Sequence, residues 1–323
     1  MRAFEAYRDA EVLVLGGGGF IGTWVAAALV HAGARVTVSA RNREAALAAL
    51  ARHGVHCEVR AFDLAHPGEA ARLVAALRPA IVFNLAGYGV DPSERDEELA
   101  ARLNAGLVAE LAENVQVKSG WRGQALVHTG SALEFGQQGG DLSDPWLCQP
   151  TTLYGRTKLA GSEALRTISL RRGVRALSAR LFTVYGAGEH AGRLLPTLLR
   201  ARSSAEPIPL TAGLQRRDFT YVGDVVHGLL RLGALHDALP SRALNLATGS
   251  LSTVREFVET AADALAVDRG RLQFGALPTR VEEMSHAPVS VRALETAVGW
   301  KPATSIRQGL LDTLAFERRA SGS

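Results

Sequence analysis

The first 186 residues alternate short apolar runs with amphipathic helical patterns, six times in succession. Each apolar run is continuous and does not alternate with polar residues, which is typical of parallel strands buried on both faces. Six strand–helix repeats predict a doubly wound parallel α/β sheet. The strands are expected within 11–19, 34–41, 55–63, 80–87, 124–131 and 174–186, and the helices within 20–33, 42–54, 67–79, 93–115 and 152–173.

The order loosens after residue 186, where helices are expected within 192–202, 223–236, 252–267, 291–299 and 306–319 and a strand within 243–248. We therefore expect two interleaved domains. Residues 1–186 with 218–249 would form the larger domain, which contains the sheet. Residues 187–217 with 250–323 would form a smaller α/β substrate domain.

Composition excludes several classes of protein. The net charge is only +4 and the Arg residues are scattered, which disfavours nucleic-acid binding. The chain has no apolar run of about 18 residues, so we expect no membrane span. Its start lacks the layout of a signal peptide. Two cysteines, Cys57 and Cys148, make neither a disulfide framework nor a metal site. The expectation is a cytoplasmic protein without a metal.

A glycine-rich turn, GGGGFIG, joins the first predicted strand to the first predicted helix. It contains Gly16, Gly19 and Gly22. Glycines at this place permit a tight turn and let backbone N–H groups approach a pyrophosphate at the helix N-terminus. The alternative is a strand-to-helix turn that binds nothing.

The end of the second strand bears on the choice of cofactor. Many dinucleotide folds place an acid here for the adenosine ribose, but this chain has Ala40 and Arg41, with Ser39 before and Arg43 beyond. An Arg and a small hydroxyl suit a 2′-phosphate, which favours NADP(H) over NAD(H). The alternative is a solvated Arg. Asp63, after the third strand, would bond the adenine amino group or cap the next helix.

Tyr154 and Lys158 stand four residues apart in a predicted helix, so they share one face of it. With five Tyr and three Lys, a Tyr-x-x-x-Lys arises by chance only about 0.05 times. A nearby ammonium stabilises a phenolate and lowers the phenol pKa, and it can donate to two ribose hydroxyls. Thr129 and Ser131 end the fifth strand, where a hydroxyl would share a substrate oxygen with Tyr154 or cap the strand end.

Together these residues resemble the extended short-chain dehydrogenase/reductase family, and within it the nucleotide-sugar epimerases, dehydratases and 4-keto-reductases. The motifs GGGGFIG, FDL, FNLAG, TGSALEFG, LYGRTK, RLFTVYG, QRRDFTYVGDV, LNLATG and VGWKP occur in the family's order over nearly the whole chain. The resemblance implies that Tyr154, Lys158 and Ser131, with Thr129, are catalytic. It also implies that the larger domain is an NADP-binding Rossmann domain and that the smaller one is a nucleotide-sugar-binding domain. Two long helices of each Rossmann domain are expected to form a homodimer. The cofactor is expected to contact Gly16, Gly19, Phe20, Ile21, Gly22, Arg41, Asp63, Leu64, Leu85, Ala86, Gly87, Asn104, Tyr154 and Lys158.

Departures from the family pattern narrow the activity. Dehydratases carry acids directly after the catalytic hydroxyl, whereas this chain has Ala132 and Leu133, and Glu134 comes one place too late. Elimination needs that acid, so dehydration is disfavoured. Combined 3,5-epimerase–reductases carry a Cys in this loop and a His after the sixth strand. No Cys lies near Ser131, and His190 sits two residues past the matching place.

The leading interpretation is therefore an NADPH-dependent reductase of a nucleotide-diphosphate 4-keto-6-deoxy sugar. The main alternative is an NAD-dependent sugar 4-epimerase; a reductase of a non-sugar carbonyl and a non-catalytic NADP-binding regulator also stay open. The family's diphosphate-binding Arg falls on Arg217, and Arg193 and Arg280 are further candidates or ordinary surface residues. Thr183 replaces a frequent substrate-contacting Asn.

Overall fold

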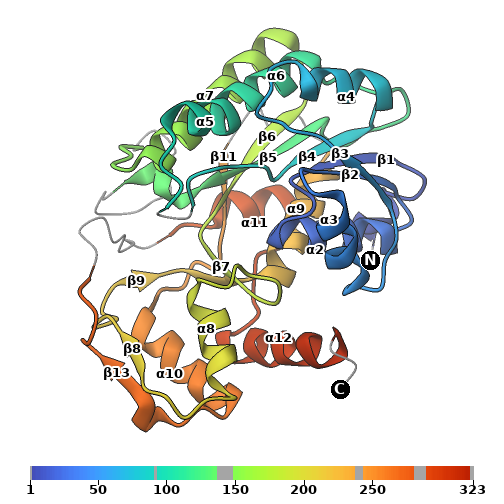
Figure 1. Cartoon of the computed structure of the whole chain (residues 1–323). Helices are drawn as coiled ribbons and strands as arrows, with labels where there is room; N and C mark the ends of the chain where they lie inside the picture. Colours follow the sequence, from blue (N-terminus) through green and yellow to red (C-terminus); the bar gives the residue numbers. More distant parts are fainter. Residues whose placement is uncertain (1, 91–92, 137–147, 237–242, 280–288, 321–323) are drawn as a thin grey trace.

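Seven parallel strands form the central sheet of the protein, in the order β11-β6-β5-β4-β1-β2-β3 (Figure 1). A computed structural model describes residues 2–90, 93–136, 148–236, 243–279 and 289–320. The strand order reverses between β1 and β4, which is where ligands bind in open α/β sheets. The strands are β1 (Glu11–Leu15), β2 (Arg35–Ala40), β3 (Glu58–Ala61), β4 (Ile81–Asn84), β5 (Leu126–Ser131), β6 (Ala176–Leu181) and β11 (Ala243–Leu246).

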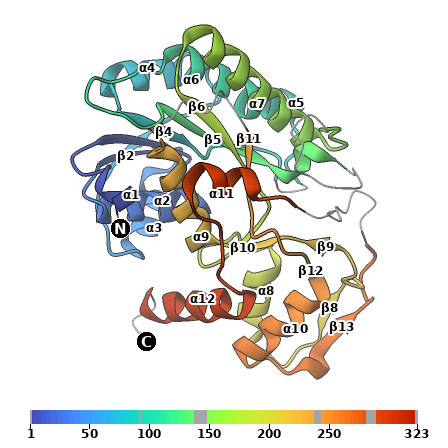
Figure 2. The same ribbon diagram turned by 180° about the vertical axis from the view of Figure 1, so that it is seen from behind.

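Helices cover both faces of this sheet, as Figures 1 and 2 show. Alternate residues of β1 serve the two layers: Val12 and Val14 pack into one core cluster, Leu13 and Leu15 into the other. On one side lie α4 (Glu69–Leu77), α5 (Glu97–Ala101), α6 (Leu107–Asn114) and α7 (Leu153–Arg172). On the other lie α2 (Phe20–His31), α3 (Arg43–Ala51), α9 (Val222–Gly233) and α11 (Arg292–Val298), with the short α1 (Arg2–Glu5) packed on α9. The predicted doubly wound sheet is confirmed.

The predicted sixth strand is two strands. β6 stays in the central sheet, but β7 (Thr183–Tyr185) leaves it and pairs with β10 (Phe219–Tyr221). The change of partner occurs where the Thr183 N–H donates to the Asp218 carbonyl, 3.0 Å away. A single strand through residue 186 was therefore wrong, and β11 supplies the seventh strand of the sheet.

The predicted long helix 93–115 begins later and is interrupted. It starts at Glu97, because the Asp96 side chain caps it by accepting from the Leu99 N–H at 3.0 Å. A π-helical turn, η1 (Arg102–Gly106), then separates α5 from α6. Such turns widen a helix by one residue and often occur at functional sites.

The remaining elements gather beside the carboxyl ends of the strands, in the lower part of Figure 1. Two small sheets join β12 to β9 and β13 to β8, and α12 packs on α10. These elements are α8 (Leu194–Ala201), β8 (Ile208–Leu210), β9 (Arg216–Arg217), β12 (Ser252–Thr253), α10 (Val254–Leu265), η3 (Arg269–Arg271), β13 (Leu272–Phe274) and α12 (Ile306–Ala320). The boundaries of the two interleaved domains stay a prediction. Within the described residues, every helix is too short or too polar to cross a membrane.

Candidate active site

The glycine-rich loop between β1 and α2 is closed so tightly that side chains would not fit. Gly16 has φ +69°, and a Cβ there would lie 2.8 Å from the Ala86 nitrogen. A Cβ on Gly22 would lie 2.3 Å from the Gly16 carbonyl oxygen. No side chain caps the N-terminus of α2 at Gly19, so the first-turn N–H groups are open to an anion. This cradle, which continues through Phe20 and Ile21 of α2, fits a dinucleotide pyrophosphate.

The segment after β4 lies between this loop and the Tyr–Lys pair. The Leu85 N–H donates to the Leu15 carbonyl at 3.0 Å, which carries the segment along β1. Ala86 borders Gly16, and a Cβ on Gly87 would lie 3.1 Å from the Lys158 ammonium. Leu85, Ala86 and Gly87, three of the predicted cofactor residues, therefore form a segment that runs from the glycine loop to Lys158.

Asn104 joins two parts of the site. It lies in the π-helical turn and is fully buried. Its amide donates to the Tyr88 carbonyl (2.7 Å) and the Thr157 hydroxyl (2.9 Å), while its oxygen accepts from the Tyr88 N–H at 3.0 Å. These bonds favour a role in positioning α7 over the direct cofactor contact expected from the sequence.

Arg41 and Ser39, at the end of β2, are the two residues predicted to bind a 2′-phosphate, and only Arg41 faces solvent. Arg41 is exposed, whereas Ser39 is 1 % exposed and its hydroxyl has no hydrogen-bond partner among the described residues. The guanidinium of Arg43 donates to the Val59 carbonyl at 3.2 Å and so braces β3. Binding of a 2′-phosphate by Arg41 stays a prediction.

Asp63 turns back onto its own loop. Its carboxylate accepts from the Ala65 N–H at 3.0 Å and lies 3.4 Å from the His66 ring nitrogen. The next helix, α4, is capped by Gly68, so the alternative that Asp63 caps it is wrong. Leu64 beside it is buried. The Asp63 side chain is half-exposed, so a bond to an adenine amino group stays open as a prediction.

Tyr154 and Lys158 lie on the first turns of α7, on one face of the helix. Thr152 fixes the start of α7 by accepting from the Gly155 N–H at 3.0 Å. The Lys158 ammonium is 5.8 Å from the centre of the Tyr154 ring and donates to the Thr129 carbonyl at 3.0 Å. Because Lys158 is only 2 % exposed, this bond holds a buried charge in a defined place.

The two hydroxyls at the end of β5 have different surroundings. Ser131 faces Tyr154, and a hydrogen bond between their side chains acts on the Tyr154 pKa. Its oxygen also accepts from the Leu133 N–H at 3.2 Å. Thr129 instead donates its hydroxyl to the Asn84 carbonyl at 3.1 Å. The arrangement therefore favours Ser131 as the residue that orients a substrate oxygen, while Thr129 contributes its carbonyl to Lys158.

Burial dominates the electrostatics of the pair. It raises the pKa of Tyr154, and Glu134 and Glu94 add to the rise, which Arg193 and Ser131 partly offset. Burial lowers the pKa of Lys158 to about 8, against the opposing effect of Glu134. The lowered phenol pKa expected from the Lys158 ammonium is thus wrong in direction. Tyr154 remains protonated at neutral pH, as a proton donor must.

The residues after Ser131 form a short 3-10 helix, η2 (Ala132–Phe135), and carry no free acid. Ala132 is apolar and buried. Glu134 is completely buried and pairs with Arg180 at 2.6 Å. A carboxylate committed to a buried guanidinium cannot serve as a mobile acid, which agrees with the expectation against elimination.

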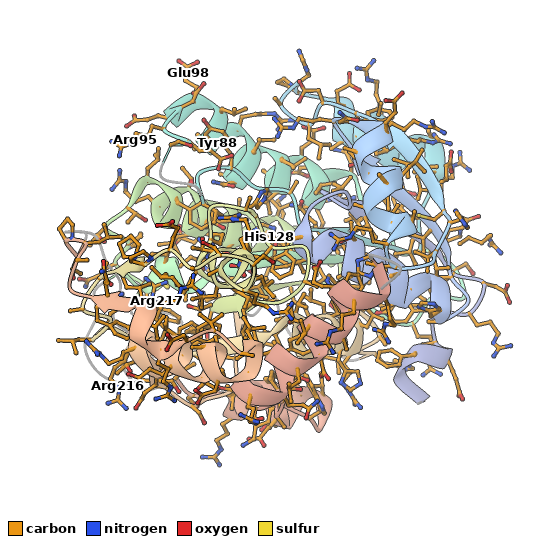
Figure 3. All side chains as sticks on the ribbon, turned by 60° about the horizontal axis from the view of Figure 1, so that its bottom comes forward. Tyr88, Arg95, Glu98, His128, Arg216 and Arg217 are labelled. Atoms are coloured by element: carbon orange, nitrogen blue, oxygen red, sulfur yellow. The ribbon has the colours of Figure 1, made fainter. Side chains whose placement is uncertain are left out.

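The substrate residues expected from the sequence that the structure describes lie on β7, on β9 and directly before α8. Thr183 begins β7, and its bond to Asp218 places it beside Arg217. Arg217 is half-buried, whereas its neighbour Arg216 is exposed; Figure 3 shows Arg216 at the rim of the molecule and Arg217 inside it. Arg280 lies outside the described residues.

Arg193 precedes α8, and its charge is close enough to act on the pKa of Tyr154. It pairs with Glu189 at 3.3 Å. The Glu189 side chain is 8 % exposed, and burial raises its pKa to about 7. One of its oxygens has no hydrogen-bond partner among the described residues. His190, between them, is exposed.

Sequence reasoning missed the roles of Glu189 and Arg180. One signal was present: Arg180 is the only charged residue in ALSARL, the strand that became β6. A charge in a buried strand requires a partner, but the sequence does not say which.

His128 also lies inside the molecule, at the centre of Figure 3. Its ring bonds the Asn84 amide at 3.2 Å, and burial together with the Lys158 charge lowers its pKa well below the usual value. His128 is therefore neutral and does not compete with Tyr154 as an acid. No group of three or more His, Cys, Asp or Glu in the described ranges could hold a metal ion.

A parallel seven-stranded sheet with this glycine loop and a Tyr–Lys pair at its carboxyl edge defines an extended short-chain dehydrogenase/reductase. The chain belongs to the NAD dependent epimerase/dehydratase family, whose sequence model matches residues 12–247. Within the extended class it falls in the group of nucleotide-sugar epimerases, dehydratases and 4-keto-reductases.

Three relatives illustrate this group. The chain is 31% identical over 317 residues to dTDP-6-deoxy-L-talose 4-dehydrogenase (NAD(P)(+)) of Kitasatospora kifunensis, covering 93% of each. It is 27% identical over 336 residues to UDP-glucuronate 4-epimerase 3 of Arabidopsis thaliana, covering 94% of this chain and 75% of the relative. Among solved structures, it is similar to MoeE5 in complex with UDP-glucose and NAD, with 29% identity, a TM-score of 0.80 and coverage of 97% and 100%.

Proposed function

We propose that the protein reduces the 4-keto group of a nucleotide-diphosphate 4-keto-6-deoxy sugar with NADPH, using Tyr154 as the proton donor. The observation that carries this proposal is the assembly of Ser131, Tyr154 and Lys158 beside a carboxylate, Glu134, that is locked in an ion pair. Redox chemistry at a carbonyl is possible with this set, whereas elimination lacks its acid.

Different residues of the chain donate the proton, orient the substrate oxygen and bind the cofactor and the substrate. A bound reduced nicotinamide supplies the hydride to the carbonyl carbon. Tyr154 gives its proton to the carbonyl oxygen, which Ser131 orients by a hydrogen bond. Lys158, fixed by the Thr129 carbonyl, would hold the nicotinamide ribose. Gly16 to Gly22 and the first turn of α2 would hold the pyrophosphate, and Arg217 the substrate diphosphate.

Similarity to the Kitasatospora dTDP-6-deoxy-L-talose 4-dehydrogenase supports a reaction at a 4-position hydroxyl or ketone. That enzyme uses NAD or NADP, which is compatible with Arg41 as a phosphate ligand. The alternative is an NAD-dependent 4-epimerase of a nucleotide sugar. The similarity to MoeE5 bound to UDP-glucose and NAD, and to a UDP-glucuronate 4-epimerase, favours that alternative.

Two assays decide between these functions. Purified protein is mixed with NADPH or NADH and a panel of nucleotide 4-keto-6-deoxy sugars, and cofactor oxidation is followed by absorbance. Stoichiometric NADPH oxidation supports the reductase. Interconversion of two nucleotide sugars without added cofactor, by protein that carries bound NAD, would replace it with the epimerase. The same preparation, in an analytical ultracentrifuge, tests the expected homodimer.

We expect the reaction to slow on the alkaline side, with a midpoint near the Lys158 pKa of about 8. Above it Lys158 is uncharged and loses its hold on the ribose, so kcat/KM for NADPH falls about tenfold per pH unit.

The effect of Lys158 on the stability of the fold can be separated from this loss of activity. Because folding lowers the Lys158 pKa from 10.5, the unfolded chain binds more protons between about pH 8 and 10.5. The contribution of Lys158 to stability therefore rises with pH in that range. Thermal unfolding measured at each pH is the control, and a flat rate profile from pH 7 to 10 would contradict the assignment.

A further inference from the structure

A buried carboxylate lies directly beneath the hydroxyl of Ser131. Glu134 is 0 % exposed and its Oε1 accepts from the Ser131 N–H at 2.9 Å. The Ser131 oxygen in turn accepts from the Leu133 N–H, so the two residues form a reciprocal capping box around η2. The backbone at Ser131 is thus fixed by the same carboxylate that lies behind it.

This carboxylate also joins the other two elements of the site. Its Oε1 accepts from the Ser162 hydroxyl at 3.2 Å, and Ser162 lies on α7 one turn beyond Lys158. Its Oε2 accepts from the Arg180 Nε of β6 at 2.6 Å. Ser162 and the Ser178 hydroxyl of β6 lie 3.1 Å apart, which closes the network. One carboxylate therefore ties β5, α7 and β6 together.

Glycines leave room for this arrangement. A Cβ on Gly130 would lie 2.5 Å from the Glu134 carboxylate and 2.8 Å from the Ser178 oxygen. A Cβ on Gly155, the residue after Tyr154, would lie 2.3 Å from the Leu133 carbonyl. The close contact of η2 with β5 and with the start of α7 therefore depends on both glycines.

The charges that face Glu134 come from two elements. β6 supplies Arg180, whose guanidinium also contacts the Cys148 sulfur at 3.3 Å and lies 4.8 Å from the centre of the Phe135 ring. The first turns of α7 supply Lys158 and the Tyr154 hydroxyl, both of which respond to the Glu134 charge. Replacing a buried ion pair by well-packed hydrophobic residues is often neutral or stabilising, so such a pair is weak evidence for a role in stability.

We propose that Glu134 is a positioning residue for the proton transfer: it fixes Ser131 opposite Tyr154 and, as a buried anion, favours the charged ammonium of Lys158 and the protonated phenol of Tyr154. Arg180 holds this anion in place. The proposal deepens the proposed function and rests on it for the identity of the proton donor. It predicts that the charge of Glu134, beyond its shape, acts on the protonation of Lys158 and opposes the effect of burial.

Lysine NMR tests the charge directly, because the chain has only three lysines, Lys118, Lys158 and Lys301. With ¹³Cε-labelled lysine, the wild-type Lys158 signal titrates near its pKa of about 8. Glu134→Gln keeps the shape and removes the charge, so its Lys158 midpoint moves to lower pH. Arg180→Gln breaks the same pair but retains the anion, so its midpoint stays at or above the wild-type value.

These variants separate charge from disruption. If Glu134→Gln leaves the midpoint unchanged, or if Arg180→Gln lowers it equally, the proposal is overturned. Should a single variant fail to fold, the double variant Glu134→Gln/Arg180→Gln must still lower the midpoint. Glu295→Gln is the matched control, since Glu295 pairs with Lys301 at the surface at 3.3 Å and should leave the Lys158 signal unmoved.

Activity gives the second readout. In Glu134→Gln, measured below its own Lys158 midpoint, kcat should fall with little change in the KM for NADPH, and the alkaline limb of kcat/KM should move to lower pH together with the NMR midpoint. A variant that retains wild-type kcat and an unmoved pH profile contradicts the proposal. If wild-type protein turns over none of the 4-keto sugars, the proposed function fails, while the NMR titration still decides the role of Glu134.

Discussion

Replacing Tyr154 by Phe is expected to lower kcat by about 10²- to 10⁴-fold, the usual contribution of a positioned acid. The substitution removes only the hydroxyl, which is the proton source for the developing alkoxide. The ring remains beside Lys158, whose bond to the Thr129 carbonyl is untouched. Cofactor affinity should therefore be nearly unchanged. Steady-state rates and NADPH fluorescence titration measure the two quantities.

Tyr7→Phe is the matched control. Its hydroxyl donates to the Leu230 carbonyl at 2.6 Å in the core, away from the site. Loss of that bond should cost about 1 kcal/mol of unfolding free energy and leave kcat unchanged. Near-wild-type turnover by Tyr154→Phe would show that another group delivers the proton.

Arg41→Ala is expected to weaken NADPH binding by about 10- to 100-fold, which corresponds to the loss of charge-assisted hydrogen bonds to a 2′-phosphate. NADH carries no such phosphate, so its affinity should change little. The exposed position of Arg41 at the end of β2 allows this selective effect. Calorimetric titration with both cofactors measures the ratio of the two dissociation constants.

The neighbouring Arg43→Ala provides the comparison. Arg43 braces β3 through the Val59 carbonyl, so its loss should affect NADPH and NADH alike. If Arg41→Ala weakens both cofactors equally, the phosphate assignment fails and NAD becomes the expected cofactor.

The central sheet could be predicted from the sequence because its signals are local. Continuous apolar runs, glycines at helix ends and the loop GGGGFIG each act within a few residues. The split of the sixth strand could not, because the N–H of Thr183 leaves the sheet for a carbonyl, that of Asp218, 35 positions further along the chain. The local sequence around either residue does not indicate that the two pair.

The candidate site could also be predicted only in part. The spacing of Tyr154 and Lys158 guarantees a shared helix face, so their proximity was predictable. The surroundings of other single side chains were not: Ser39 in β2 is buried, Asp63 bonds its own loop and Asn104 in the π-helical turn bonds Tyr88. Each depends on tertiary neighbours.

A shift of one residue along the sequence separates the ion-paired Glu134 from the position of a catalytic acid. The sequence placed it one residue past the position of a dehydratase acid. In the structure that single step turns it away from the crevice and onto Arg180. A residue set aside as misplaced thus occupies a defined place behind the site.

The π-helical turn at Arg102–Gly106 accommodates one extra residue between α5 and α6. Each residue of an α-helix advances about 100° around its axis, and a π turn contains one residue more than an α turn. Deleting one residue here would leave an ordinary α turn, so α6 would keep its orientation and Leu107 and Leu111 would stay against the sheet that buries them. A one-residue deletion inside α6, where no wider turn compensates for it, would rotate the residues beyond it by that angle and should be tolerated far less.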